Sequence, residues 1–287
     1  MKTILVTGAS GFIGSALVNQ LKHMNFNVLE FNSTMGDIVE YDFSTEYMDK
    51  EIYHIFHLAS KTFVPDSWEK PIDFYKTSVI GTGNILELCR KQNIPLTFVS
   101  AYLYGLPEKL PISENDKIKS NNPYAHSKYL VEELCRFYSE YYDVKITIAR
   151  PFNIYGKKQK DMFLIPHIIE QVLNDDNIKV KDLNPKRDYI YLDDLISGLL
   201  KTLNNTKQFS IYNFGSGMEL SVNEIIEIIQ NVADTNKKII SENSERKNEI
   251  MHVIADISKV KNDLGWSPKF NFEDGIKEII KDLNNDN

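Results

Sequence analysis

Tyr124 and Lys128 have the types and the spacing of an acid–base pair for redox chemistry. They lie in the segment Asn122-Pro-Tyr-Ala-His-Ser-Lys128, so on a helix the phenol and the ammonium share one face, one turn apart. A free tyrosine ionises near pH ~10, but an ammonium within a few ångströms favours the phenolate and lowers its pKa. Such a phenolate could take the proton of an alcohol. Because Tyr-x-x-x-Lys also occurs by chance, its meaning depends on the rest of the chain.

A glycine-rich turn near the start of the chain supplies the second chemical element. The segment Thr7-Gly-Ala-Ser-Gly-Phe-Ile-Gly14 follows a short apolar run and opens a helical pattern. In such a turn, Gly8 permits the tight bend, Gly11 lets the backbone approach a pyrophosphate, and Gly14 lets helix and strand pack closely. The free N–H groups and the positive end of the helix dipole then face the phosphates. With the Tyr–Lys pair, this turn indicates redox chemistry on an alcohol or ketone with a nicotinamide cofactor.

Alternating strand and helix patterns must position these two elements. Strands separated by helices imply right-handed crossovers and a parallel sheet covered on both faces. We therefore predict an α/β fold, with a Rossmann-type doubly wound parallel sheet and a smaller C-terminal α/β substrate-binding domain. In the first half, strands are expected at 4–6, 27–31, 55–58, 96–99 and 146–148, and helices at 13–23, 74–91 and 124–141.

The pattern changes after Arg150. We expect a dinucleotide-binding domain over 1–155 and a mainly substrate-binding domain over 156–287, with the chain crossing back into the first domain around 185–215. In this half, helices are expected at 163–174, 193–203, 221–233 and 273–283, and short strands at 178–181 and 210–212.

Composition excludes several classes of protein. The 287 residues, 42% of them hydrophobic and 25% charged, are ordinary for a soluble protein of about two domains. A net charge of −7 argues against a nucleic-acid partner, and no apolar run approaches the ~18 residues of a membrane span. Cys89 and Cys135 are too few for a disulfide scaffold, so we expect buried thiols in the cytoplasm. His54 and His57 point to opposite faces of a predicted strand, and no metal site is expected.

Motifs along nearly the whole chain resemble the extended short-chain dehydrogenase/reductases, and more specifically the nucleotide-sugar epimerase/dehydratase family. The first is the Gly-x-x-Gly-x-x-Gly spacing after Thr7. The resemblance implies NAD or NADP as cofactor, a nucleotide-diphosphate sugar as substrate, and a homodimer formed through the helices at 74–91 and 124–141. The further motifs are His57-Leu-Ala-Ser60, Val79-Ile-Gly-Thr82, Leu103-Tyr-Gly105, Arg150-Pro-Phe-Asn-Ile-Tyr-Gly156, Arg187-Asp-Tyr-Ile-Tyr-Leu-Asp-Asp194 and Leu264-Gly-Trp-Ser-Pro268.

The resemblance also assigns roles to single residues. It implies a catalytic set of Ser100, Tyr124 and Lys128, in which the serine hydroxyl donates a hydrogen bond to the substrate oxygen. Its cofactor set is Gly8, Ser10, Gly11, Phe12, Ile13, Gly14, Asn32, Asp42, Phe43, Leu58, Ala59, Ser60, Tyr124, Lys128 and Pro151. Its substrate set is Lys61, Ser100, Phe152, Asn153, Arg187 and Arg246.

Two of the substrate assignments have simpler alternatives. The guanidinium of Arg187 suits a diphosphate because its fork donates two hydrogen bonds, but it could instead pair with Asp188 or Asp193 at the surface. Phe152 could lie against the sugar or the cofactor, or be an ordinary core residue.

Departures from the family pattern bear on cofactor and reaction. Asn32 stands where the family usually places an Asp on the adenosine ribose, and a neutral amide tolerates a 2′-phosphate. No arginine follows it, and Glu30 on the same strand face could substitute, so NAD and NADP both stay open. Ala101 and Tyr102 replace the Asp–Glu pair of 4,6-dehydratases, which argues strongly against that elimination. Ser78 replaces a frequent Asn and is expected to alter how the helix of Tyr124 is held.

Three functions follow from these residues. The leading hypothesis is a nucleotide-sugar 4-epimerase, which oxidises the C4 alcohol and returns the hydride to the other face. The alternative is an NADPH-dependent 4-keto-6-deoxysugar reductase, for which Asn32 is the motive. A non-catalytic cofactor-sensing protein is the third, and the retention of Ser100, Tyr124 and Lys128 argues against it.

Overall fold

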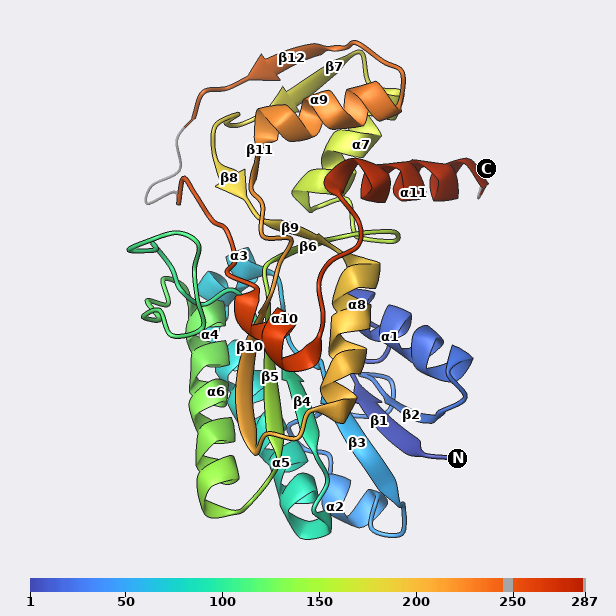
Figure 1. Cartoon of the computed structure of the whole chain (residues 1–287), viewed down its shortest axis with the longest axis vertical. Helices are drawn as coiled ribbons and strands as arrows, with labels where there is room; N and C mark the ends of the chain where they lie inside the picture. The colour runs from blue at the N-terminus through green and yellow to red at the C-terminus, as the bar shows by residue number, and fades with distance from the viewer. Residues whose placement is uncertain (245–249, 286–287) are drawn as a thin grey trace.

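The computed structural model describes residues 1–244 and 250–285, which form a Rossmann-type domain and a smaller α/β domain above it (Figure 1). The main sheet has six strands in the order β10-β5-β4-β3-β1-β2, and every neighbouring pair is parallel. The predicted fold class and the five strands expected in the first half are confirmed. The strands are β1 (Thr3–Thr7), β2 (Asn27–Phe31), β3 (Ile52–His57), β4 (Leu96–Val99), β5 (Ile146–Pro151) and β10 (Phe209–Phe214).

The strand order reverses beside β1. The chain passes from β1 to β2 on one side and then places β3 on the other side of β1. In such sheets, ligands bind outside the carboxyl ends of the strands at this switch point. The glycine turn, which follows β1, and Leu58–Ser60, which follow β3, both lie there.

Helices cover both faces of this sheet. Ile4 and Val6 pack with α1 and α8 on one face, whereas Leu5 packs with α5 and α6 on the other. Successive side chains of a strand point to opposite faces, so strands buried on both sides consist of continuous apolar residues. The covering helices are α1 (Phe12–His23), α5 (Gly81–Gln92), α6 (Pro123–Tyr141) and α8 (Leu192–Lys201).

His54 and His57 are core residues of β3. The His54 ring hydrogen-bonds Thr97 at 2.9 Å, and the His57 ring lies between the hydroxyls of Thr7, at 2.6 Å, and Thr82, at 2.9 Å. Burial lowers the pKa of both histidines to about 3, so both rings are neutral. Residues 1–244 and 250–285 contain no cluster of three metal-ligating side chains.

The expected helix over 74–91 is interrupted. It consists of α4 (Pro71–Tyr75), a π-helical turn over Lys76–Ile80, and α5. A π turn inserts one residue into a helix and often marks a functional site. Here the turn brings the Ser78 hydroxyl to 3.1 Å from that of Ser127, one residue before Lys128 on α6. Ser78 therefore does contact the helix that carries Tyr124.

The smaller domain has its own apolar core. Its helices α7 (Leu164–Asn174), α9 (Val222–Val232) and α11 (Phe272–Asn285) surround a core that includes Ile168, Ile225 and Ile276. Strands β7 (Asn177–Val180) and β12 (Lys238–Ser241) pair in parallel at the top of Figure 1. Two short pairs lie nearer the main sheet: β6 (Asn153–Tyr155) with β9 (Tyr189–Tyr191), and β8 (Lys186–Arg187) with β11 (Leu220–Ser221).

The chain returns to the first domain before it finishes. β10 is longer than the strand expected at 210–212, and it pairs with β5 as the edge strand of the main sheet. α8 packs against α1, and Trp266 lies in the same core. This core therefore draws residues from both halves of the sequence.

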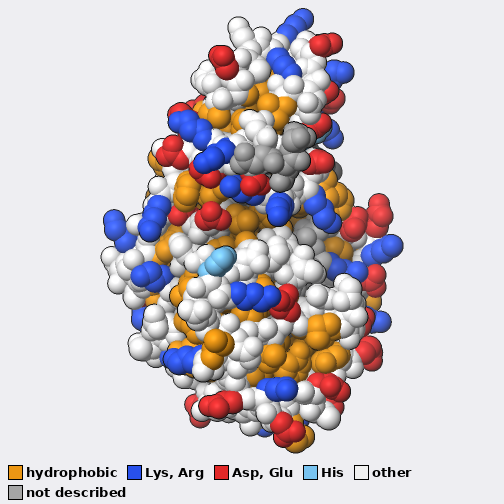
Figure 2. Space-filling model, turned by 90° about the vertical axis from the view of Figure 1, so that its right-hand side faces the viewer, with side chains coloured by type: hydrophobic (Ala, Val, Ile, Leu, Met, Phe, Trp, Pro, Cys, Tyr) orange, Lys and Arg blue, Asp and Glu red, His pale blue; other side chains and the backbone are white. Residues whose placement is uncertain are grey.

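The surface carries interspersed charges. On the face that lies to the right in Figure 1, Figure 2 shows acidic and basic side chains mixed over the whole height of the molecule. Within the described ranges, the structure contains no helix of the length and apolarity that a membrane crossing requires.

Candidate active site

The glycine turn after β1 is a cradle made of backbone. Gly8 has φ +70°, and a Cβ there would lie 2.7 Å from the backbone nitrogen of Ala59. A Cβ on Gly14 would lie 2.1 Å from the carbonyl oxygen of Gly8. The amide of Gly11 donates to that same carbonyl at 3.0 Å, which closes the turn. Side chains at Gly8 and Gly14 would therefore prevent the close approach of β1, β3 and α1.

The start of α1 is open to an anion. Its N-cap is Gly11, no side chain caps the helix, and its first turn contains no acidic residue. The amide groups that follow, at Phe12 and Ile13, thus have no competing carboxylate, and Ser10 is exposed beside them. This geometry fits the pyrophosphate of a dinucleotide.

Position 32, at the adenosine end of the turn, carries an amide and not a carboxylate. The Asn32 side-chain oxygen accepts hydrogen bonds from the amide of Thr34 at 3.0 Å and from its hydroxyl at 2.6 Å. Glu30, a possible substitute, pairs with Lys22 at 2.6 Å. The amide nitrogen of Asn32 is what remains to bind a ribose or a phosphate.

The other residues assigned to the adenosine end, Asp42 and Phe43, have structural contacts of their own. The carboxylate of Asp42 caps helix α2 (Phe43–Glu46) by accepting from Thr45, which lowers its pKa. The Phe43 side chain is fully buried in the core beside Phe31 and Tyr47. Phe43 could therefore reach a cofactor only through its backbone.

The opposite wall of the cofactor region is formed by strand ends. Leu58, Ala59 and Ser60 follow β3 and are half-buried, and the exposed Lys61 comes next. The amide of Ala59 lies 3.3 Å from the Thr7 hydroxyl, which ties this segment to β1. Pro151 ends β5 and is buried.

Tyr124 and Lys128 lie on the first two turns of α6. The Asn122 side chain caps the helix by accepting from the Ala125 amide at 2.8 Å, and Pro123 occupies the first helical position. The Lys128 ammonium donates to the carbonyl of Val99 at 3.0 Å, immediately before Ser100. The helix thus brings the predicted Tyr–Lys pair to the end of β4.

Burial dominates the pKa values of this pair in the protein alone. It raises the pKa of Tyr124 to about 12. It lowers the pKa of Lys128 to about 8, an effect that the negative charge of Glu132 opposes. The ammonium lies against Val99 and the ring of Phe98, so it does not lower the pKa of Tyr124 as the spacing had predicted.

Ser100 joins a buried ionic network. Its hydroxyl donates to the carboxylate of Glu132 at 2.5 Å, and Glu132 pairs with Arg150 at 2.5 Å. Arg150 donates further to the Tyr104 hydroxyl at 2.8 Å, and that hydroxyl donates to Asn213 on β10 at 2.6 Å. The sequence interpretation did not include Glu132, although its place four residues after Lys128 puts it on the same helix face.

Three substrate candidates lie in or near the short strands: Phe152 directly after β5, Asn153 at the start of β6, and Arg187 at the end of β8. Phe152 is buried with Tyr104 and Ala255, which makes it a core residue. The Asn153 side chain donates to the carbonyl of Asp188 at 3.1 Å. The Arg187 guanidinium donates to the carbonyls of Lys186 and Ile250.

Asp188 is paired with backbone amides and not with Arg187. The buried carboxylate of Asp188 accepts hydrogen bonds from the amides of Ser216, Gly217 and Ala255, so it organises the loops around Arg187. Arg246 lies outside the described residues. The hydroxyl of Tyr102 donates to the Gly105 carbonyl at 2.6 Å; burial raises its pKa, and the nearby Arg187 opposes that shift.

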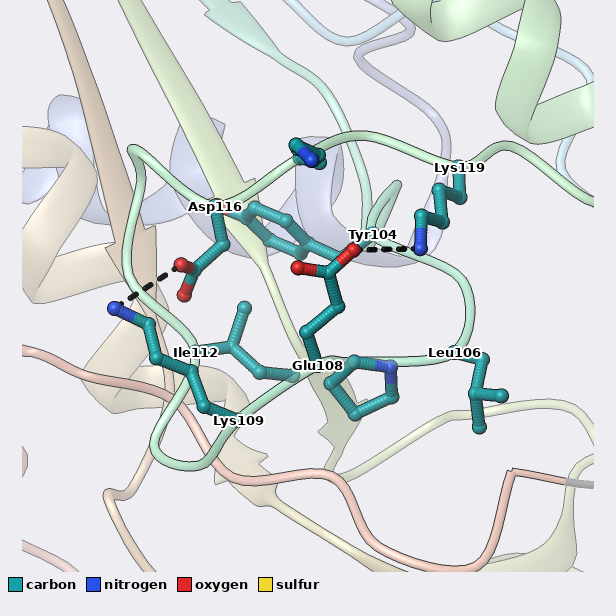
Figure 3. Close-up of a pocket in the computed structure, with 9 residues that line it drawn as sticks. Tyr104, Leu106, Glu108, Lys109, Ile112, Asp116 and Lys119 are labelled. Atoms are coloured by element: carbon teal, nitrogen blue, oxygen red, sulfur yellow. Dashed lines mark hydrogen bonds and ion pairs between the residues drawn. The ribbon is translucent and has the colours of Figure 1, made fainter.

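A small pocket lies in the loop that follows β4 (Figure 3). Four of its charged side chains form two ion pairs: Lys109 lies 3.3 Å from Asp116, and Lys119 lies 2.8 Å from Glu108. Tyr104 lies at its base, and none of the predicted catalytic, cofactor or substrate residues lines it. The pocket is therefore separate from the candidate site.

The fold and the site define a nicotinamide-dependent enzyme with a Rossmann domain. Residues 4–215 match the NAD dependent epimerase/dehydratase family, and the chain belongs to that family. It is 33% identical, with 99% of both chains covered, to a Methanocaldococcus jannaschii protein to which UDP-glucose 4-epimerase activity is provisionally assigned. It is also 28% identical to the GDP-6-deoxy-D-mannose reductase of Pseudomonas aeruginosa, with 97% of this chain and 96% of the relative covered.

Two solved structures share the whole architecture. The UDP-glucose 4-epimerase of Thermotoga maritima with UDP-glucose has a TM-score of 0.93 and 26% identity, with 99% of both chains covered. RMD from Pseudomonas aeruginosa complexed with NADPH has a TM-score of 0.91 and 26% identity, with 100% of both chains covered. The family thus includes both of the reactions that the sequence suggested.

Proposed function

We propose that this protein is a nucleotide-sugar 4-epimerase that acts through NAD(P)-dependent oxidoreduction at C4 of the sugar. The observation that carries the proposal is the convergence of α6 and β4, where Lys128 binds the carbonyl that precedes Ser100. Tyr124 stands one helical turn before Lys128, beside Ala101 at the end of β4. The similarity to the two UDP-glucose 4-epimerases supports the same reaction.

In this mechanism the protein supplies proton transfer and orientation. When bound, the nicotinamide ring accepts and returns hydride at the sugar carbon. Tyr124, in the phenolate form that the positive charge of a bound nicotinamide would favour, takes the C4 hydroxyl proton as the C–H bond breaks, and returns it when the ketone is reduced on its other face. Lys128 binds the nicotinamide ribose, and Asn153, Arg187 and Arg246 hold the diphosphate of the sugar nucleotide.

Analysis of released cofactor tests this proposal. The purified protein is denatured, the released nucleotides are identified by mass spectrometry, and UDP-glucose is assayed for conversion to its C4 epimer. An epimerase regenerates its cofactor in each cycle, so retained NAD and formation of the epimer are expected. A protein that retains no cofactor but oxidises added NADPH with a 4-keto sugar would contradict the epimerase assignment.

The NADPH-dependent 4-keto-6-deoxysugar reductase is the second candidate, and the adenosine end of the site favours it. Asn32 places a neutral amide where a carboxylate would oppose a 2′-phosphate, and Glu30, its possible substitute, is paired with Lys22. Calorimetric titration with NADP⁺ and NAD⁺ measures this directly. Binding of NADP⁺ at least as tight as that of NAD⁺ supports the reductase. Exclusive binding of NAD⁺ would contradict it.

We further propose that two copies associate through α4, α5 and α6. The exposed apolar side chains of this region are Ile72 on α4, Ile80 in the π turn, and Leu130, Phe137 and Tyr141 on α6, and a second copy would cover them. Light scattering coupled to size exclusion should give twice the chain mass of 33.2 kDa. The double substitution Leu130→Glu and Phe137→Glu should give monomers, and a wild-type monomer at micromolar concentration would contradict the proposal.

A cytoplasmic location is also proposed. Cys89 and Cys135 are free and buried, which suits a reducing compartment. Fractionation of cells that express the tagged chain should recover it with cytoplasmic markers, and recovery in an extracellular or membrane fraction would contradict this location.

A further inference from the structure

The hydroxyl of Ser100 uses its only proton inside the protein. It donates that proton to Oε1 of Glu132 at 2.5 Å, and both residues are buried, with exposed fractions of 4% and 2%. A hydroxyl has one donor hydrogen and two acceptor lone pairs. With the hydrogen directed at a carboxylate, only the lone pairs of Ser100 are left for a substrate.

Glu132 is held firmly enough to impose this orientation. Nε of Arg150 lies 3.0 and 3.1 Å from Oε1 and Oε2 of Glu132, and Nη2 of Arg150 lies 2.5 Å from Oε2. The guanidinium is itself fixed by the Tyr104 hydroxyl at 2.8 Å and by the Glu114 carbonyl at 3.3 Å. A buried carboxylate with this many charge-assisted partners has no alternative position of similar energy.

Glu132 is on the same helix as Tyr124 and Lys128. Tyr124, Lys128 and Glu132 succeed one another at intervals of four along α6, so their side chains follow one face. The negative charge of Glu132 favours the charged form of Lys128 and so opposes the lowering of the Lys128 pKa by burial. Glu132 thus hydrogen-bonds Ser100 and lies one helical turn after Lys128, and these are two of the three predicted catalytic residues.

We propose that Glu132 is a positioning residue that fixes Ser100 as a hydrogen-bond acceptor for the sugar C4 hydroxyl, a role that rests on the proposed function. The sugar hydroxyl donates to Ser100 Oγ and is thereby oriented before Tyr124 takes its proton. This reverses the donor role that the sequence suggested for the serine. It also gives the Glu132–Arg150 pair a function besides stability.

A double-mutant cycle tests this role. The variants are Glu132→Gln, Ser100→Ala and the two combined, each assayed for kcat and KM with the nucleotide sugar and for the Kd of NAD⁺. A carboxamide can donate to Ser100 and reverse its orientation, so Glu132→Gln should lower kcat about 10-fold or more, while KM and Kd change less than about 2-fold. In the Ser100→Ala background, the same change should lower kcat less than about 2-fold, because the group it orients is gone.

A matched control and a second variant keep the outcome clear. Glu133→Gln removes the adjacent, exposed carboxylate, which pairs loosely with Arg136 at 3.7 Å, and should leave kcat unchanged. If Glu132→Gln does not fold, Glu132→Asp keeps the charge but withdraws the carboxylate from Ser100, and the same non-additive loss is expected. Unchanged kcat, or a Glu132 effect that multiplies in full with Ser100→Ala, would overturn the role. An inactive wild type would overturn the proposed function and this role with it.

Discussion

The two ends of the candidate site are built from different materials. At the cofactor end, Gly8, Gly11 and Gly14 form a cradle of backbone atoms, in which a side chain added at Gly8 or Gly14 would collide. At the catalytic end, buried charged and polar side chains from four segments hold Ser100 in place. The cofactor end depends on the absence of side chains at its glycines. The catalytic end depends on side chains that must all be present and paired. Substitutions should therefore affect the two ends in different ways.

The largest expected effect comes from Tyr124→Phe at the catalytic end. Loss of the proton-transferring hydroxyl should lower kcat by about 10³-fold, within the range for general acid–base groups. The Kd for the cofactor should change by less than about 2-fold, because the glycine turn is untouched. Steady-state kinetics and calorimetry measure the two quantities, and activity near that of the wild type would remove Tyr124 from the mechanism.

Arg150→Met should give the largest loss of stability. It leaves the carboxylate of Glu132 buried without its partner, which costs about 3–5 kcal/mol of unfolding free energy. The control is Arg136→Met on the surface of α6, which removes an exposed pair and should cost less than about 1 kcal/mol. Urea denaturation followed by circular dichroism measures both losses. Equal losses would show that the buried Glu132–Arg150 pair contributes no more to stability than the exposed pair.

Gly14→Ala tests the backbone-built end. The new Cβ would lie 2.1 Å from the Gly8 carbonyl oxygen, so α1 must move away from β1, at about 1–3 kcal/mol. Cofactor affinity should fall by at least 10-fold. Gly83→Ala is the control, since a Cβ there meets nothing within 4 Å and should stabilise α5 by about 0.5–1 kcal/mol. If both substitutions leave cofactor affinity intact, the cradle does not bind the pyrophosphate.

The smallest expected effect is at Asn32, whose side chain is expected to contact the cofactor at the end otherwise formed by backbone. Asn32→Asp adds a carboxylate that repels a 2′-phosphate, so the Kd ratio of NADP⁺ to NAD⁺ should rise about 10-fold. Asn27→Asp, at the other end of β2, is the matched control and should leave the ratio unchanged. An unchanged ratio for Asn32→Asp would show that this residue does not contact the adenosine ribose.

The cofactor end could be predicted from the sequence because its determinants are local. Gly8, Gly11 and Gly14 lie within seven residues. At the catalytic end, only the Tyr124–Lys128 pair is local in the same way, within one turn of a helix that opens on Asn122. A motif position alone could not show whether a residue acts through its side chain. Phe43 matched the cofactor pattern, yet its ring packs in the core beside Phe31.

The catalytic network could not be predicted in the same way. Glu132 contacts Ser100 across 32 residues of sequence and Arg150 across 18, and no periodic pattern relates these positions. Asp188 likewise binds the amides of Gly217 and Ala255, which lie 29 and 67 residues away. The π turn at Lys76–Ile80 was missed because a single inserted residue barely disturbs helical periodicity. Such features depend on the tertiary arrangement of strand ends.

The late return of β10 to the sheet has a consequence for synthesis of the protein. A ribosome releases β1 to β5 first, but the edge of β5 has no partner until Phe214 has emerged. During that interval the nascent chain presents an unpaired strand, which is a template for association with other chains. The segment between Pro151 and Phe209 therefore sets the length of the delay during which this edge of the sheet is exposed.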